Sequence, residues 1–300
     1  MEFVISIYSD LYVPFLYVCI DSIMKNHKDA SVVIVWDDIS DKEILLLRHH
    51  FQSVTFIKNT QNIFHSDITV RIPLKLRFWV YYLKNTKEKT ICFLDSDTLV
   101  YKNISNYINA DFDFLFTWKD EKFPLNVGVV IVNNNDRIIK FFQLWLEKIE
   151  QIVENKKILK HACLTHGAAD QQALVDLMGE NDYQSGFTVK YDFGDIRFKP
   201  VSCNELNQTN SIPINSNAHI FHYKGGWHPI LLKEAGYSAY RLQKQSYEMH
   251  RFWENRLTEI NDTLMHDFVI QAADKYITNV NWGNIDHETR GILNSEMLAV

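Results

Sequence analysis

The chain has 300 residues, of which 46% are hydrophobic and 23% are charged. This composition is typical of a globular protein with a substantial core and excludes an intrinsically disordered chain. The net charge of -6 at pH 7 argues against sequence-independent nucleic-acid binding, which needs a cationic field to displace counterions.

The first half of the chain alternates between strand and helix patterns. Apolar runs rich in β-branched residues predict buried strands at 3–8, 31–36, 54–57 and 90–94. Amphipathic patterns predict helices at 11–26, 40–50 and 73–83. Ser40 and Glu43 match a capping box at the start of the second helix. This alternation predicts an α/β fold with a mostly parallel sheet and helices on both faces.

The second half of the chain is less regular. Strands are predicted at 112–116, 128–133 and 218–223, and helices at 137–154 and 170–178. From about residue 238 the sequence becomes helical and rich in aromatic residues. We find no repeat and no Pro/Gly-rich linker. The simplest partition is therefore one catalytic domain, residues 1–235, with a helical C-terminal extension, residues 236–300.

The cysteines and the first residues bear on the compartment. The cysteines lie far apart and form no CxxC pair, so we expect buried free thiols in a reducing compartment: Cys19, Cys92, Cys163 and Cys203. The segment MEFVISIYSD lacks the basic region and cleavage site of a signal peptide. No apolar run approaches the ~20 residues of a membrane-spanning helix. We expect a cytoplasmic protein, and a peripheral contact with the inner membrane face stays open.

Two aspartates close the strand pattern in the segment ICFLDSDTLVY. Residues i and i+2 of a strand point to the same side, so Asp95 and Asp97 can converge on one ion. Carboxylates suit Mg²⁺ and Mn²⁺, and such an ion can neutralise a diphosphate. Asp10, Asp37 and Asp38 also follow predicted strands, where ligands bind in parallel α/β sheets. Asp-Ser-Asp-Thr is also ordinary turn chemistry, so the pair alone leaves both interpretations open.

The segment FLDSDTLV also resembles the first motif of haloacid-dehalogenase-like phosphohydrolases. In those enzymes the first aspartate attacks phosphorus, which would make Asp95 a nucleophile. That motif usually begins its fold, whereas several strand and helix patterns precede it here. The nearest downstream acidic segment, YDFGDIRF at 191–198, lacks a second acid at a suitable spacing. We keep this hypothesis as the lesser alternative.

The order of several short motifs from about Phe3 to Pro229 resembles the retaining glycosyltransferase family eight. This family includes bacterial lipooligosaccharide galactosyltransferases and glycogenins. The resemblance implies a GT-A fold and a hexosyltransferase that uses a nucleotide-sugar donor, with UDP-galactose or UDP-glucose expected. It also implies Mn²⁺, with Mg²⁺ as the alternative, and transfer with retention to a hydroxyl of a glycan or lipid-linked acceptor.

The resemblance assigns the donor-binding residues of the first half. Tyr8 and Asp10, in the loop after the first strand, would hold the base and the ribose. In PLKLRFW, Arg77 fits best as the basic residue that reaches the donor phosphates, and Lys75 is the alternative. In the DxD segment, the resemblance implies that the metal and the diphosphate are bound by Asp95, Ser96 and Asp97.

The resemblance also assigns roles to later residues. Asn126 would contact the donor sugar, and Gly128 would let the backbone approach the ligand. Asp170 and Gln171, at a predicted helix start, would lie near the reacting sugar. His222 would be the third metal ligand, and an imidazole beside two carboxylates favours Mn²⁺ over Mg²⁺.

One departure concerns the cation expected near the leaving group. The family's phosphate-binding lysine follows a glycine, whereas Lys224 precedes Gly225 here. Either Lys224 or His228 would take that role. No catalytic nucleophile is evident, so front-side attack and an enzyme nucleophile both stay open. A nucleotide-sugar-binding protein without turnover is the third hypothesis.

Overall fold

The computed structural model describes residues 1–8, 12–60, 68–71, 73–108, 111–119, 124–179, 181–208 and 217–222. Several sequence-based predictions lie outside these residues. They are the helical extension, the boundary at residue 235, and the roles of Asp10, Lys224, Gly225 and His228.

An eight-stranded sheet forms the centre of the described part, in the order β3-β2-β1-β4-β7-β6-β9-β8. The strands of its first half are β1 (Glu2–Ile7), β2 (Ser31–Trp36), β3 (Thr55–Lys58) and β4 (Thr90–Asp95). Those of its second half are β6 (Phe114–Trp118), β7 (Leu125–Asn133), β8 (Phe187–Tyr191) and β9 (Gly194–Ser202).

The direction of the strands changes across the sheet. β3, β2, β1 and β4 are parallel to one another, and β6 is parallel to β9. β7 is antiparallel to both β4 and β6, and β8 and β9 form an antiparallel hairpin. The α/β prediction is confirmed, with a parallel first half and a mixed second half. The carboxyl ends of β1 and β4 therefore meet at one edge, where Ser6 pairs with Asp95.

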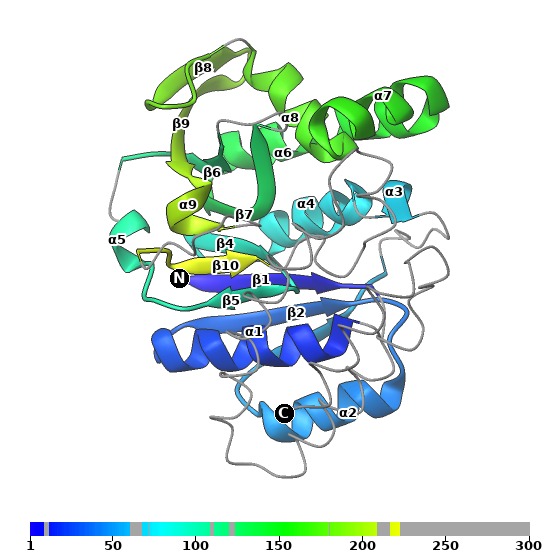
Figure 1. Ribbon diagram of the computed structural model, residues 1–300, viewed down its shortest axis with the longest axis vertical. Coiled ribbons are helices and arrows are strands. Elements are labelled where there is room, and N and C mark those ends of the chain that lie inside the picture. Colours follow the sequence, from blue (N-terminus) through cyan, green and yellow to red (C-terminus); the bar gives the residue numbers. More distant parts are fainter. Residues whose placement is uncertain are drawn as a thin grey trace, which may run out of the picture.

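Helices cover both faces of this sheet (Figure 1). One face carries α1 (Val13–Asn26) and α2 (Asp41–His50); the other carries α4 (Leu76–Asn85), α6 (Asp136–Glu154) and α8 (Ala169–Met178). Successive strand residues point to opposite faces, so Phe3 and Ile5 pack with α1 while Val4 packs with α4 and α6. Each such burial contributes about 1.5–3 kcal/mol.

Side-chain caps define where several helices begin. Ser40 Oγ accepts a hydrogen bond from Glu43 N at 3.3 Å and donates one to Glu43 Oε2 at 3.1 Å, which confirms the capping box. Asn135 caps α6, and Asn155 caps a further helix that follows at once, α7 (Lys156–His166). The shorter helical segments are α3 (Ile68–Arg71), η2 (Pro73–Lys75), α5 (Ser105–Ile108) and α9 (Cys203–Leu206).

A small second sheet connects distant parts of the chain. It consists of β5 (Thr98–Val100) and β10 (Ile220–His222), which pair antiparallel with Thr98 opposite His222. β5 follows β4 after a two-residue turn, so this pairing carries residue 222 to the carboxyl end of β4. The short sheet thus positions the candidate site.

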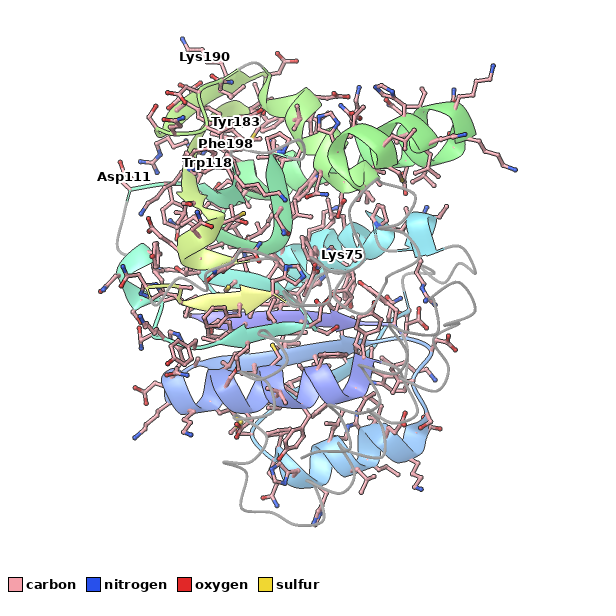
Figure 2. All side chains as sticks on the ribbon, viewed as in Figure 1. Lys75, Asp111, Trp118, Tyr183, Lys190 and Phe198 are labelled. Atoms are coloured by element: carbon pink, nitrogen blue, oxygen red, sulfur yellow. The ribbon has the colours of Figure 1, made fainter. Side chains whose placement is uncertain are left out.

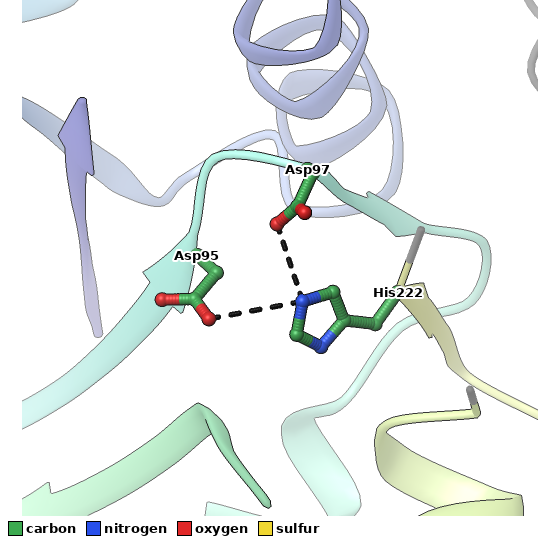
Figure 3. A group of neighbouring side chains, drawn as sticks. All are labelled: Asp95, Asp97 and His222. Carbon is green, nitrogen blue, oxygen red and sulfur yellow. Dashed lines mark ion pairs between the residues drawn. The ribbon is translucent and has the colours of Figure 1, made fainter. Parts of the chain in front are cut away.

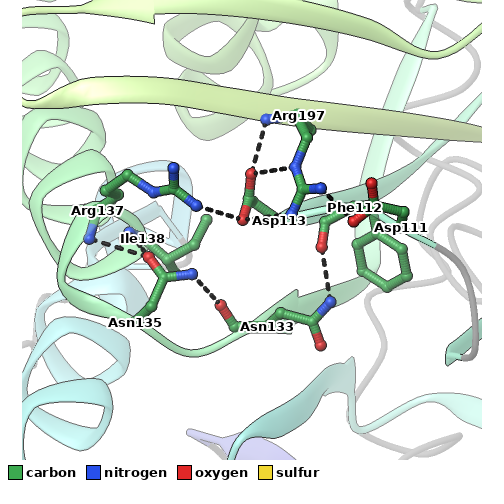
Figure 4. Close-up of polar contacts among 8 residues, drawn as sticks. All are labelled: Asp111, Phe112, Asp113, Asn133, Asn135, Arg137, Ile138 and Arg197. Atoms are coloured by element: carbon green, nitrogen blue, oxygen red, sulfur yellow. Dashed lines mark hydrogen bonds and ion pairs between the residues drawn. The ribbon is translucent and has the colours of Figure 1, made fainter.

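A buried carboxylate joins three elements of the second half (Figure 4). Asp113, which is 1% exposed, accepts hydrogen bonds from Arg197 N and Nε at 3.0 Å each on β9. It accepts another from Arg137 Nη2 of α6 at 3.1 Å. Arg197 also pairs with Asp111. Asp113 therefore ties the start of β6 to α6 and β9.

Two other expectations can be compared with the described residues. Cys19, Cys92 and Cys203 are buried thiols outside any disulfide, as expected, and Cys163 is a thiol of the same kind that is partly exposed. Within the described ranges, the helices do not combine the length and the apolar character that a membrane crossing requires.

Candidate functional site

Asp95, Asp97 and His222 converge at the carboxyl end of β4 (Figure 3). His222 Nε2 lies 3.2 Å from Asp97 Oδ1 and 3.7 Å from Asp95 Oδ2. Taking one ligand atom from each residue, all three lie within 4.8 Å of one another. The chain achieves this because β10 pairs with β5 and sets His222 opposite the turn that holds the two aspartates.

The chemistry of these three groups suits a divalent cation. Burial acts to raise the pKa of Asp97, but the neighbouring His222 outweighs it, and the pKa of Asp97 lies below its ordinary value. Asp97 is therefore a carboxylate at neutral pH. Two carboxylates and one imidazole form a donor set of oxygen and nitrogen atoms. Such a set fits Mn²⁺ better than it fits Mg²⁺, because Mg²⁺ prefers oxygen ligands alone.

Lys75 lies inside the molecule (Figure 2), next to Asp95. Its Nζ is 2.6 Å from Asp95 Oδ1, and its side chain is 2% exposed. The ammonium also lies 5.0 Å from the centroid of the Trp79 ring. Burial acts to lower the pKa of Lys75, but the carboxylates of Asp95 and Asp170 outweigh it and raise the pKa above its ordinary value. The site therefore contains a fixed positive charge.

Arg77 points to a different part of the molecule. Its Nη2 and Nε each lie 2.8 Å from Glu150 Oε1 of α6. Residues two apart on a helix do not share a face. The sequence favoured Arg77 over Lys75 as the basic residue near the donor site. The structure instead places Lys75, the alternative, beside Asp95, while Arg77 joins α4 to α6.

A buried chain of polar groups supports His222 from behind. His222 Nδ1 lies 3.0 Å from Asn207 Oδ1, and Asn207 Nδ2 donates to Thr117 Oγ1 at 2.8 Å. Thr117 Oγ1 in turn donates to the carbonyl of Asn126 at 2.7 Å. Sequence analysis missed Asn207 and Thr117, because no local motif surrounds either residue.

Gly128 is required by the position of His222. A Cβ atom at Gly128 would lie 2.3 Å from His222 Cε1 and 2.5 Å from Nδ1, which no real packing allows. The close approach that the structure shows at Gly128 is to the histidine ring, and the expected approach to a ligand stays a prediction. Asn126, which is 3% exposed, accepts a hydrogen bond from Gly128 N at 2.9 Å and holds this segment in place.

Asp170 and Gln171 begin α8 and are both buried. Asp170 Oδ1 accepts from Gln171 N at 2.9 Å, and its charge acts on Lys75. Gln171 Nε2 donates to the carbonyl of His166 at 2.7 Å, while its buried Oε1 has no hydrogen-bond partner in the described part of the chain. The pair therefore lies on the Lys75 side of the site.

Tyr8 and Ser96 stand at the ends of adjacent strands, β1 and β4. The Tyr8 hydroxyl is buried, and the side chain of Ser6 lies next to it. Its burial raises the pKa of this phenol well above the ordinary value, and the nearby Asp95 adds to the effect. Ser96 is buried in the turn between the two aspartates. Both predicted donor-binding residues thus border the aspartate pair.

The two aspartates after β2 make their own contacts at the neighbouring strand end. Asp37 accepts a hydrogen bond from Asn59 at 3.0 Å. Asp38 has a positive φ of 56° and lies 3.7 Å from Arg71. They border the site edge but are not part of the Asp95, Asp97 and His222 cluster.

No protein-family model matches this sequence, and no curated protein matches it either. Solved structures do match the fold. The architecture of the sheet and these matches show that the chain is an α/β protein with the GT-A fold of glycosyltransferases.

Three solved structures illustrate this likeness. The chain is similar to the galactosyltransferase LgtC in complex with donor and acceptor sugar analogs, with a TM-score of 0.50 and 15% identity over 83% of this chain and 96% of that chain. The glycosyltransferase GlyE of Streptococcus pneumoniae TIGR4 matches with a TM-score of 0.52 and 14% identity, over 76% of this chain and 56% of that chain. The bifunctional glycosyltransferase WbbM matches with a TM-score of 0.55 and 11% identity, over 91% of this chain and 51% of that chain. At such identities the likeness establishes the fold.

Proposed function

We propose that this chain is a metal-dependent glycosyltransferase that moves a hexose from a nucleotide diphosphate sugar to a hydroxyl group. The observation that carries the proposal is the convergence of Asp95, Asp97 and His222, whose ligand atoms lie within 4.8 Å of one another. The GT-A fold supports it, because that fold places such a group at the end of a central strand. UDP-galactose and UDP-glucose are the donors that we favour.

The three ligand residues would hold Mn²⁺, with Mg²⁺ as the alternative. A bound cation of this kind would supply the positive charge that makes a diphosphate a competent leaving group. The residues themselves have to stay in place as the leaving group gains charge. The turn at Ser96 keeps the two aspartates on one short segment, and the pairing of Thr98 with His222 holds the histidine beside that segment. This arrangement favours preorganised electrostatic stabilisation.

We assign the second positive charge to Lys75 instead of Arg77. The Lys75 ammonium is buried next to Asp95, so it would face the diphosphate without being screened by water. Arg77 is engaged by Glu150. Lys224 or His228 would add a further cation, as the motif order suggests.

The remaining assignments follow the resemblance to family eight. Tyr8 and Asp10 would hold the base and ribose, and Gly225 would border the diphosphate. Asn126 would contact the donor sugar, and Asp170 and Gln171 would lie on its reacting face. The orphan Oε1 of Gln171 is the kind of buried acceptor that a sugar hydroxyl would satisfy. We expect transfer with retention to a glycan or lipid-linked acceptor.

The phosphohydrolase alternative is not favoured by the fold. The segment 191–198, which would have to supply its downstream acids, is the β8–β9 hairpin. β8 is the edge strand of the sheet, and β7, β6 and β9 separate it from β4. Acidic residues of this hairpin therefore lie several strands away from Asp95, too far to assist Asp95 as a nucleophile.

The proposal is tested by incubating the full chain with UDP-glucose or UDP-galactose, Mn²⁺ and a panel of glycan acceptors, and by measuring UDP release. We expect Mn²⁺-dependent release that is lost in Asp97→Asn. Phosphate release from a simple phosphate ester through an Asp95 adduct would support the phosphohydrolase instead. Tight UDP-sugar binding without turnover over the whole acceptor panel would support the third hypothesis, a nucleotide-sugar-binding protein.

A further inference from the structure

Asn207 is a fully buried amide whose orientation is fixed by its neighbours. It is 0% exposed. The hydroxyl of Thr117 donates to the Asn126 carbonyl at 2.7 Å, so its oxygen is left to accept from Asn207 at 2.8 Å. The same carbonyl, which can only accept, lies 3.5 Å from Asn207 Nδ2. The NH₂ group of Asn207 must therefore face Thr117, and its Oδ1 must face His222.

This orientation determines where His222 carries its proton. Asn207 Oδ1 lies 3.0 Å from His222 Nδ1, and an amide oxygen can only accept a hydrogen bond. Nδ1 is therefore protonated. Nε2 is then the nitrogen that can give its lone pair to a cation, and Nε2 is the atom that faces Asp97 at 3.2 Å and Asp95 at 3.7 Å.

We propose that Asn207 is a positioning residue that holds His222 in the tautomer whose Nε2 binds the divalent cation. The inference rests on the proposed metal site and deepens it. The hydrogen bond sets the tautomer, while close packing against Gly128 sets the plane of the ring. Partners behind a ligating histidine commonly fix its tautomer and orientation in this way, and their loss weakens metal binding.

The sharpest test compares two substitutions at the same position. Asn207→Leu and Asn207→Asp both remove the NH₂ donor to Thr117, but only the aspartate variant keeps an acceptor for His222 Nδ1–H. Free Mn²⁺ is followed by electron paramagnetic resonance during titration, with and without UDP. We expect Asn207→Leu to weaken Mn²⁺ binding by about 10–100-fold and Asn207→Asp to stay close to the wild type.

Two further variants separate this role from a general loss of stability. Thr117→Val keeps the shape of the side chain but removes the group that orients Asn207, so it should weaken Mn²⁺ binding in the same direction and by less. Asn133→Leu removes another structural amide, which lies away from the metal site. The Asn133 side chain donates a hydrogen bond of 2.6 Å to the Phe112 carbonyl. Asn133→Leu should lower the melting temperature without changing Mn²⁺ affinity.

A second readout reports the tautomer directly. Long-range ¹H–¹⁵N correlation of the protein loaded with Zn²⁺, a diamagnetic stand-in for Mn²⁺, should show the His222 proton on Nδ1 in the wild type and a loss of this signal in Asn207→Leu. An Nε2–H wild type, or equal losses of affinity in the Leu and Asp variants, would overturn the inference. A wild type that binds no Mn²⁺ overturns the proposed metal site as well, whereas normal wild-type binding that Asn207→Leu leaves intact overturns the inference alone.

Discussion

The ammonium of Lys75 lies 2.6 Å from Asp95 Oδ1, and only 2% of the lysine side chain is exposed. A buried charge is tolerated where a partner of opposite sign compensates its lost hydration. Three carboxylates act on Lys75, with Asp95 and Asp170 ahead of Asp97. Lys75 therefore holds one oxygen of Asp95 and leaves the other facing His222.

The first prediction separates Lys75 from Arg77. Lys75→Met keeps the aliphatic stem but removes the charge, so UDP release from the donor should fall about 100-fold. Arg77→Met breaks the ion pair with Glu150 and should leave the rate within about 3-fold, because partly exposed ion pairs contribute little. Initial rates at saturating Mn²⁺ give the comparison. An Arg77→Met enzyme that is as impaired as Lys75→Met would contradict the assignment.

The second prediction concerns Gly128. In Gly128→Ala the new methyl group would lie 2.3 Å from His222 Cε1, so the ring or the β7 backbone has to move. Mn²⁺-dependent activity should be lost, and the melting temperature should fall. Gly186→Ala is the matched control, because its Cβ would meet only the Phe198 carbonyl at 3.4 Å. Full activity in Gly128→Ala would show that His222 does not occupy this position.

Part of this site follows from sequence and part does not. The sequence predicted that Asp95 and Asp97 converge, but a two-residue turn after β4 brings Asp97 to the site instead of a continued strand. Motif order suggested His222. The choice between Lys75 and Arg77 depends on the phase of the helix, and the chain passes from η2 to α4 just between them. Asn207 follows α9 and meets Thr117 of β6 through a contact between distant segments that no local pattern encodes.

The fold shows the same division. The strands β1, β2, β3 and β4 were predicted to within a few residues, because they are apolar runs bounded by polar segments. β5 was missed since it has only three residues and gains its stability from β10. The β8–β9 hairpin was missed because its alternating residues are half-buried at the edge of the sheet.

The third prediction concerns stability at acid pH. Burial acts to raise the pKa of Asp113, but hydrogen bonds from Arg197 outweigh it, and the folded-state pKa lies below the ordinary value. The contribution of Asp113 to the free energy of unfolding is therefore complete above its pKa in the unfolded chain, about 3.9. It is lost as the pH falls through the lower pKa of the folded protein. Asp113→Asn should cost about 2 kcal/mol at neutral pH.

Urea unfolding over a series of pH values measures this difference. The difference in the free energy of unfolding between the wild type and Asp113→Asn should be constant near neutral pH and should become smaller below about pH 4. Asp195→Asn, an exposed position on the same strand as Arg197, should change the free energy of unfolding by less than about 0.5 kcal/mol. A difference that becomes larger in acid would contradict the role of the Asp113 contacts.

The fourth prediction links metal binding to stability. An ion that binds only the folded state stabilises it, by about 2.7 kcal/mol at 100 times its dissociation constant. Mn²⁺ should therefore raise the melting temperature of the wild type, and EDTA should reverse the increase. His222→Ala and Asp97→Asn should show no such response. An equal Mn²⁺ response in these variants would place the binding site elsewhere.

The central claim is that Asp95, Asp97 and His222 hold a divalent cation against a nucleotide diphosphate. A crystal grown with Mn²⁺ and UDP, measured at the manganese absorption edge, tests it most directly. The account predicts an anomalous peak that is bonded to both carboxylates and to His222 Nε2, with the UDP diphosphate next to it. A manganese peak at another position, or UDP bound away from the end of β4, would contradict the account.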